Sequence, residues 1–284
     1  MASKAKEKEN RMDKISLAGD LGSGKSTVSD ILIRELGAEY YSTGSIVRSI
    51  AEKMNMSVVE LNHYMETHPE IDTMIDDGIA ALSDDPRMLV IDSRMAWHFT
   101  RGTFRVYMTV DLETSALRIM NANRRGEHSA TLDRTVAETR ARRLSEQKRY
   151  MEQYGVDIKD LMNYDLIVDT TFASPEEVAA VIISEFRRWQ SDKSVTALAY
   201  ICPERLSYPD DAPDADLIAE LSDRLDGGED IPEVSVSESD GEFYTVTGVE
   251  SALAYAFNMN VHVPARLTRY EESDIKYVKM KNSI

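Results

Sequence analysis

An eight-residue loop, Gly19-Asp20-Leu21-Gly22-Ser23-Gly24-Lys25-Ser26, constrains this chain more than any other stretch. It fits the pattern G-x-x-x-x-G-K-[ST], and it follows a short apolar run that is typical of a buried strand. Residues 27–36 then carry apolar side chains at helical spacing. A glycine-rich turn that only joins a strand to a helix is the alternative interpretation. The strand and helix patterns on either side favour a phosphate-binding loop in an α/β fold.

Each fixed position of this loop has a reason to hold phosphate. Glycines let successive backbone N–H groups point at one anion, and the helix that follows adds its positive N-terminal end. Lys25 can reach the β- and γ-phosphates of a triphosphate, and the Ser26 hydroxyl can ligate the Mg²⁺ that bridges them. We therefore expect ATP and Mg²⁺ to bind here. The expected cofactor-binding residues are Gly19, Gly22, Ser23, Gly24, Lys25, Ser26 and Thr27.

Composition excludes several other classes of protein. The chain has 284 residues, of which 42% are apolar, enough for a sizeable core in one large domain or two smaller ones. A net charge of −17 argues against a general affinity for nucleic acid or for anionic membranes. The one cysteine, Cys202, fits a reducing compartment and a buried apolar role. Without a signal peptide or a long apolar segment, we expect a cytoplasmic protein with a flexible N-terminal tail over residues 1–13.

Strand and helix patterns alternate beyond the loop. Further strands are expected at 38–42, 88–91, 104–110 and 165–169, and helices at 45–54, 57–82 (two, interrupted near His68-Pro69), 112–123 and 174–190. With the strand before the phosphate loop, five strands alternate with helices. This order predicts a three-layer α/β fold with a five-stranded parallel sheet.

Charged residues follow the ends of two of these strands, where open parallel sheets bind their ligands. Arg48 comes shortly after the second strand, and Asp92 and Arg94 come directly after the strand at 88–91. Asp92 can hold the water shell of Mg²⁺ or a substrate hydroxyl, and Arg94 can clamp a phosphate. A solvated arginine at position 48 and a structural Asp–Arg pair at the end of the strand are the alternatives.

A basic segment interrupts the acidic chain between residues 124 and 149. Its cations are Arg124, Arg125, Arg134, Arg140, Arg142, Arg143, Lys148 and Arg149. A charged helix with few apolar residues is typical of a mobile lid that closes over phosphates and supplies charge to the transition state. For individual positions the alternative is a solvated helix in which Glu138 and Glu146 pair with arginines one turn away.

Residues 14–190 resemble the small nucleoside monophosphate kinases, most closely the cytidylate kinase-like family in its shorter, archaeal-type form. The resemblance rests on the phosphate loop together with Ser42-Thr43-Gly44-Ser45-Ile46-Val47-Arg48, Asp92-Ser93-Arg94, Glu138-Thr139-Arg140-Ala141-Arg142 and Tyr164-Asp165-Leu166-Ile167-Val168-Asp169-Thr170. It implies that ATP, with Mg²⁺ at its phosphates, phosphorylates CMP or dCMP.

The resemblance also implies roles for individual residues. Arg48 and Arg94 would hold the acceptor monophosphate beside Thr43, Gly44 and Asp92. The catalytic residues would be Lys25, Arg94 and the lid arginines Arg140 and Arg142, and the metal ligands would be Ser26 and Asp92. Two positions depart from the family pattern: Asp20 is an acid inside the phosphate loop, and Ser93 stands where glycine is common. A carboxylate at position 20 must point away from the phosphates, meet the water shell of the metal, or weaken binding.

The last third of the chain differs from the rest in its charge. From Ser194 onward it has 18 acidic and 7 basic residues, net −11, against 32 acidic and 26 basic residues, net −6, before it. Strand, helix and hairpin patterns predict a small α+β domain over residues 195–284, and their order resembles the ParB/sulfiredoxin-like fold. That family has arginines just after the glycine that begins its helix, whereas here Gly248 is followed by Val249-Glu250-Ser251. We therefore expect a degenerate, non-catalytic module for regulation or for contacts with a protein partner or a second copy of the chain. The alternatives are a second active site and a domain that only stabilises an oligomer.

The leading hypothesis is a Mg²⁺-dependent nucleoside monophosphate kinase with CMP or dCMP as the acceptor. One alternative is a phosphate-loop kinase of another small acceptor. Another is a nucleotide-sensing regulatory protein whose C-terminal domain binds a partner. The basic segment favours an enzyme, because a sensor has little use for charge directed at a transition state.

Overall fold

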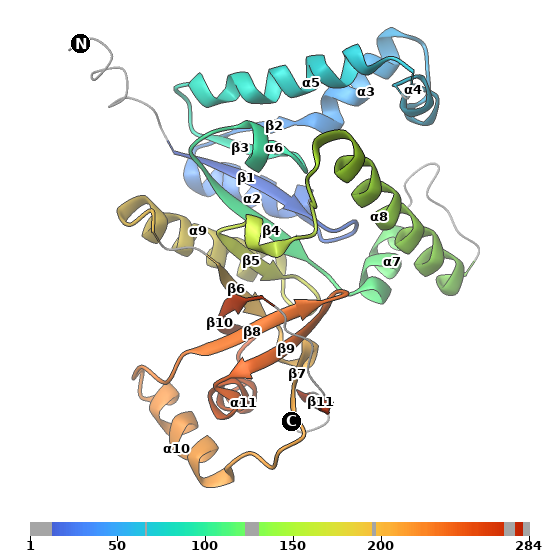
Figure 1. Cartoon of the computed structure of the whole chain (residues 1–284). Helices are drawn as coiled ribbons and strands as arrows, with labels where there is room; N and C mark the ends of the chain where they lie inside the picture. The colour runs from blue at the N-terminus through green and yellow to red at the C-terminus, as the bar shows by residue number, and fades with distance from the viewer. Residues whose placement is uncertain (1–12, 66, 123–130, 195–196, 270–275, 281–284) are drawn as a thin grey trace, which may run out of the picture.

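The computed structural model describes residues 13–65, 67–122, 131–194, 197–269 and 276–280 (Figure 1). The predicted tail over residues 1–13 therefore lies almost entirely outside the described residues. Within these ranges eleven strands form one mixed sheet in the order β11-β7-β9-β8-β10-β6-β5-β4-β1-β3-β2. No helix in the described ranges is both long and apolar enough to cross a membrane.

All five predicted strands are confirmed, and they are parallel neighbours in the order β2-β3-β1-β4-β5. They are β1 (Lys14–Gly19), β2 (Glu39–Ser42), β3 (Leu89–Asp92), β4 (Thr103–Thr109) and β5 (Leu166–Asp169). In the register Leu17 lies opposite Asp92, and Gly19 lies opposite Met108. The phosphate loop therefore leaves the sheet at its carboxyl edge, between the ends of β3 and β4.

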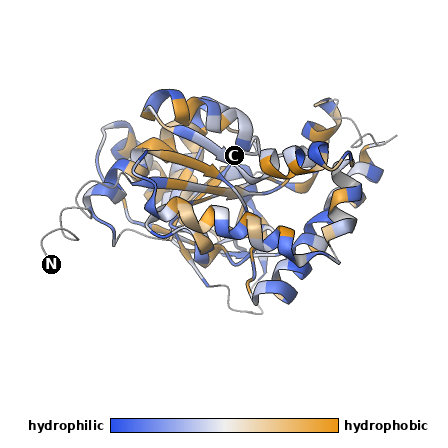
Figure 2. Cartoon of the chain, turned by 90° about the horizontal axis from the view of Figure 1, so that it is seen from above, coloured by the Kyte–Doolittle hydropathy of each residue, from blue (hydrophilic) through white to orange (hydrophobic). Residues whose placement is uncertain are grey.

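Helices cover both faces of these strands. They are α2 (Lys25–Leu36), α3 (Thr43–Lys53), α4 (Val58–Met65), α5 (Pro69–Ala81), α6 (Ala96–Phe99), α7 (Leu112–Asn121), α8 (Leu132–Tyr154) and α9 (Pro175–Ser191). The side chains of α2 and α9 share one buried cluster with β1, β4 and β5. Ser174 and Glu177 form a reciprocal capping box at the start of α9. Figure 2 shows hydrophobic strands in the middle of the molecule and hydrophilic residues on the outer turns of the helices.

The C-terminal third contributes the other six strands and two helices. They are β6 (Leu198–Ile201), β7 (Leu206–Pro209), α10 (Ala215–Asp226), β8 (Val234–Ser239), β9 (Glu242–Thr247), α11 (Val249–Phe257), β10 (Val263–Thr268) and β11 (Tyr277–Lys279). The expected hairpin is present as β8 and β9, which turn at Asp240 and Gly241. Strands β7 and β11 are additions that the sequence patterns did not predict.

The structure differs from the predicted five-stranded sheet, because the C-terminal third extends that sheet. Strand β6 runs parallel to β5, with Leu198 opposite Leu166. One buried cluster joins Ile167 of β5 to Leu206 and Phe243 of the last third. The physical reason is the apolar run of β5, since an uncovered strand of this kind would present an unpaired hydrophobic edge to water. The two parts therefore share both a sheet and a hydrophobic core.

Candidate active site

The phosphate loop has the backbone shape that its glycines predict. Gly24 caps α2 with a φ of 82°, in the left-handed region that favours glycine. At Gly22 a Cβ atom would lie 2.7 Å from the carbonyl oxygen of Ser115, so a larger residue would collide with α7. Lys25 folds back over the loop, and its Nζ donates to the carbonyl oxygens of Gly19 at 3.0 Å and Asp20 at 3.1 Å. The loop is thus ordered around the Lys25 ammonium group.

The surroundings of Lys25 lower its pKa. Burial, and after it the charge of Arg94, bring the pKa to about 8 from the ordinary value near 10.5. The carboxylates of Asp92, Asp20 and Glu146 act in the opposite direction without restoring the ordinary value. An anion beside Lys25 would favour its charged form, so binding of phosphate and protonation of Lys25 are linked.

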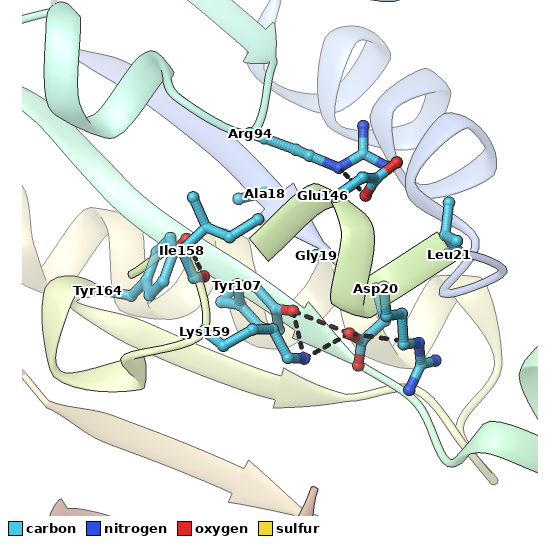
Figure 3. A pocket seen from close by; sticks show the side chains of 11 residues that line it. Ala18, Gly19, Asp20, Leu21, Arg94, Tyr107, Glu146, Ile158, Lys159 and Tyr164 are labelled. Atoms are coloured by element: carbon cyan, nitrogen blue, oxygen red, sulfur yellow. Dashed lines mark hydrogen bonds and ion pairs between the residues drawn. The ribbon is translucent and has the colours of Figure 1, made fainter. Parts of the chain in front are cut away.

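Asp20 does not direct its carboxylate into the phosphate cradle (Figure 3). Its oxygens accept hydrogen bonds from the Tyr107 hydroxyl at 2.8 Å and the Thr109 hydroxyl at 3.2 Å, both on β4, and from Val110 N at 3.2 Å. Lys159 Nζ donates to Oδ1 at 2.7 Å. Burial would raise the pKa of Asp20, but the charges of Lys159 and Arg143 and these hydrogen bonds hold it well below the usual range. Lys159 is a residue that sequence reasoning missed.

The end of β3 lies directly beside the phosphate loop. Ser93 N donates to the carbonyl oxygen of Leu17 at 3.3 Å, which fixes the first residue after the strand against β1. Asp92 Oδ2 accepts from the Tyr40 hydroxyl at 2.8 Å, and the Asp92 carbonyl accepts from the Thr43 hydroxyl at 3.4 Å. Three predicted site residues, Thr43, Asp92 and Arg94, are therefore brought together at one edge of the sheet.

Gly44 and Arg48 lie on the first turns of α3, and both are exposed. Arg48 Nη2 donates to the Ser45 hydroxyl at 3.1 Å. The predicted pairing of Arg48 with Arg94 around one phosphate stays a prediction.

Helix α8, the predicted lid, contacts the phosphate-loop side of the molecule through its middle turns. Glu146 bridges two arginines, with Oε2 at 2.8 Å from Arg94 Nε and Oε1 at 3.4 Å from Arg142 Nε. Arg143 points inward, 3.9 Å from Asp20, and donates to the carbonyl of Val110 at 3.4 Å. Figure 3 shows Arg94 and Glu146 facing each other above Asp20.

The predicted lid arginines are thus arranged unequally. Arg142 shares the Glu146 carboxylate with Arg94, whereas Arg140 lies exposed on α8. Arg143, which the sequence placed in the basic segment without a separate role, comes nearest to the phosphate loop. Arg124 and Arg125 lie outside the described residues.

A cavity of about 330 Å³ lies between the phosphate loop, α7 and the start of α9. Its wall combines loop residues 22–24 and 26–28 with Arg118 and with residues of the segment from Thr170 to Val178. Arg118 reaches across from α7, and its guanidinium donates to the Thr170 carbonyl at 2.5 Å and to the Gly22 carbonyl at 3.4 Å. The volume lies in the range of small-molecule sites, about 300 to 1,000 Å³. Arg118 was also missed, because one arginine on an amphipathic helix gives no sequence signal.

The fold and the loop define the class of this protein. It is an α/β protein in which β1 to β5 are parallel, and the glycine-rich loop 19–26 lies at their carboxyl edge, with Arg94 after β3 and Arg143 on α8 beside it. The chain belongs to the cytidylate kinase-like family, whose model matches residues 14–172.

Proteins similar in sequence to this chain agree with its membership of the family. The chain is 36% identical to a cytidylate kinase of Thermoplasma volcanium over 175 residues, which cover 60% of this chain and 90% of that protein. It is also 36% identical to a cytidylate kinase of Thermoplasma acidophilum over 173 residues, 60% of this chain and 89% of the other. A third relative, an S-adenosylmethionine-dependent nucleotide dehydratase of Lacinutrix mariniflava, is 35% identical over 179 residues, 62% of this chain and 36% of that longer protein. The C-terminal third lies beyond the match of the family model.

Proposed function

We propose that this protein transfers a phosphoryl group from ATP to a nucleoside monophosphate, with CMP or dCMP as the first acceptor. The observation that carries the proposal is that Lys25 and Arg94, two cations from different elements, lie at one place on the sheet edge. Lys25 Nζ donates to the carbonyls of Gly19 and Asp20, and Arg94 lines one pocket with the same two residues. Two phosphates that must meet in line need cations on both sides.

In this proposal the donor and the acceptor occupy opposite sides of the loop. Lys25 and the N-terminal end of α2 hold the donor triphosphate, while its nucleoside lies in the cavity beside Arg118. Arg94 holds the acceptor monophosphate, which displaces the Glu146 carboxylate from that arginine. Because the acceptor phosphate is itself the nucleophile, no strong general base is required. Charge neutralisation and alignment supply the rate enhancement.

The residues present fit a magnesium ion. Ser26 presents an exposed hydroxyl at the first turn of α2, and Asp92 presents a carboxylate at the end of β3. Oxygen donors of this kind, together with phosphate oxygens, are what Mg²⁺ prefers. When bound, the ion supplies neutralising charge at the donor phosphates.

The choice of CMP or dCMP is supported by the names of the two Thermoplasma relatives. A phosphate-loop kinase acting on another small acceptor is the second candidate, because Arg94 would pair with the phosphate of any phosphorylated acceptor. Both candidates use the same donor site. They differ only in the acceptor beside Arg94.

The test is a coupled assay of ADP release with ATP, Mg²⁺ and a panel of ribonucleoside and deoxyribonucleoside monophosphates. We expect turnover with CMP or dCMP, its loss in Lys25→Ala, and a raised KM for the acceptor in Arg94→Ala. Arg101→Ala is the matched control, because Arg101 has an 80% exposed side chain in a long ion pair with Asp84. Activity on no nucleoside monophosphate would refute the proposal. Unchanged kinetics in Arg94→Ala would remove that residue from the acceptor site.

A further inference from the structure

Arg205 is a buried cation at the point where the C-terminal third meets the kinase-like part. It follows β6, and its side chain is 8% exposed. One guanidinium nitrogen, Nη1, lies 3.1 Å from Oδ1 of Asp169, the last residue of β5, whose side chain is fully buried. The other, Nη2, donates to the carbonyl of Gly241 at 2.6 Å, in the turn between β8 and β9. One side chain therefore ties the end of β5 to the C-terminal hairpin.

Other groups from the same third converge on Asp169. Cys202 N donates to Asp169 Oδ2 at 3.2 Å, and His262 Nε2 donates to the Asp169 carbonyl at 2.8 Å. A buried carboxylate without a cation carries a desolvation cost, and Arg205 supplies the cation beside Asp169 that offsets this cost. The C-terminal third thus fixes both the side chain and the backbone of this residue.

From Asp169 the contacts continue into the wall of the donor cavity. The Thr171 hydroxyl donates to Asp169 Oδ1 at 2.6 Å and accepts from Arg205 Nη1 at 3.0 Å. The Thr171 hydroxyl oxygen also accepts a hydrogen bond from Asp111 N at 3.1 Å. Asp111 is the residue that caps the N-terminus of α7. The backbone of residues 170–171 is thereby held between the last third and the helix that carries Arg118.

Arg118 completes the connection. Its Nη2 donates to the carbonyls of Thr170 and Thr171, and its Nη1 donates to Gly22 in the phosphate loop. Arg118, Thr170 and Gly22 all line the cavity of about 330 Å³. A displacement of Asp169 or Thr171 would therefore move the acceptor oxygens that hold the Arg118 guanidinium against the loop.

We propose that Arg205 is a positioning residue for the nucleotide donor, and that the C-terminal third is by this route a part of the ATP site. The inference rests on the proposed use of ATP and goes beyond it. Arg205 acts through Asp169, Thr171 and Arg118, and it does not touch the ligand. Its loss should weaken binding of the donor and leave binding of the acceptor unchanged, because neither Arg94 nor α3 lines the cavity that Arg118 lines.

The test measures equilibrium binding of Mg²⁺ with a non-hydrolysable ATP analogue to the full-length chain by calorimetry. We expect Arg205→Met to raise the Kd of the analogue about tenfold, and Arg205→Lys about threefold, because lysine keeps the charge but has no second nitrogen for Gly241. In steady-state assays the KM for ATP should rise in step, while the KM for the acceptor stays within about twofold. Arg266→Met is the matched control, since Arg266 forms an exposed ion pair with Glu233 in the same third of the chain.

The outcomes separate this inference from the proposed function. If the wild type does not bind the analogue, the proposed donor is wrong and the inference fails with it. If the wild type binds and both Arg205 variants bind equally well, the inference alone is overturned. A lower melting temperature with unchanged Kd would mean a purely structural role and would also overturn it. If Arg205→Met does not fold, Arg205→Lys decides, because it retains the buried cation.

Discussion

The pair formed by Asp20 and Lys159 gives the sharpest prediction about stability. The side chain of Asp20 is 3% exposed and that of Lys159 is 29% exposed, and their charged atoms are 2.7 Å apart. Lys159→Met would leave the carboxylate buried with hydrogen bonds from Tyr107, Thr109 and Val110 N, and with Arg143 at 3.9 Å. Removal of one partner from a buried ion pair is destabilising because an uncompensated charge remains in a medium of low polarity.

The magnitude follows from what remains around the carboxylate. Breaking a buried pair costs about 3 to 5 kcal/mol, and the remaining donors and Arg143 reduce that to about 2 to 3 kcal/mol. For a chain of this size about 2 to 4 °C of melting temperature corresponds to 1 kcal/mol, so we expect a loss of roughly 4 to 12 °C near neutral pH. Lys148→Met is the control, because the side chain of Lys148 is 75% exposed in a 3.6 Å pair with Glu152 and should change stability by less than about 0.5 kcal/mol.

The pH dependence gives the same prediction a second readout. In the wild type the pKa of Asp20 is lower in the folded than in the unfolded chain, so Asp20 contributes stability above about pH 4 and loses it as the pH falls further. In Lys159→Met the charge of Lys159 no longer opposes the effect of burial on Asp20. The pKa of Asp20 therefore rises, and the folded variant takes up a proton more readily. The difference in unfolding free energy between the two proteins should therefore narrow as the pH is lowered below about 4. Equal melting temperatures at pH 7, or a difference that widens below pH 4, would refute the reasoning.

Two further predictions concern the phosphate loop and the C-terminal third. Because the pKa of Lys25 is about 8 in the free protein and rises when an anion binds, the affinity for the ATP analogue should be constant below pH 8 and fall by up to about tenfold per pH unit above it. Calorimetry from pH 6.5 to 9.5 checks this, and Lys25→Met should bind weakly with no such slope. A chain that ends at Lys193 should lose cooperative unfolding and most of its soluble yield, because β5 would become an uncovered edge. A truncated chain that melts like the wild type would instead support two independent domains.

The sequence predicted the kinase-like fold well because its signals are local. Glycine, proline and capping residues mark the ends of elements, as Ser174 and Pro175 do for α9. The strands that carry the site are buried apolar runs, and the parallel order follows from the alternation with helices. Lys25, Asp92 and Arg94 could be assigned to one edge of the sheet because parallel strands end at the same edge.

The pairing of side chains could not be predicted in the same way. Lys159 lies 139 residues from Asp20 in the sequence, and no pattern within either segment specifies the contact. The direction of α8 is a similar case, because a helix of mixed charge has no dominant apolar face to orient it. The sequence therefore gave no basis for distinguishing the inward Arg143 from the exposed Arg140.

The boundary predicted near residue 194 follows a change in composition, and the pairing of β6 with β5 joins strands from both sides of it. Charge per segment describes the surface, and by that measure the last third is a separate acidic module. Pairing of β6 with β5 depends instead on backbone groups and apolar side chains, which net charge does not report. Burial of Arg205 costs desolvation energy, and the one acid paired with it among the described residues is Asp169, at the same carboxyl edge of the sheet as the phosphate loop. An arginine held in this way links the stability of the last third to the geometry of the nucleotide cavity, so a substitution at either end of the pair should affect both.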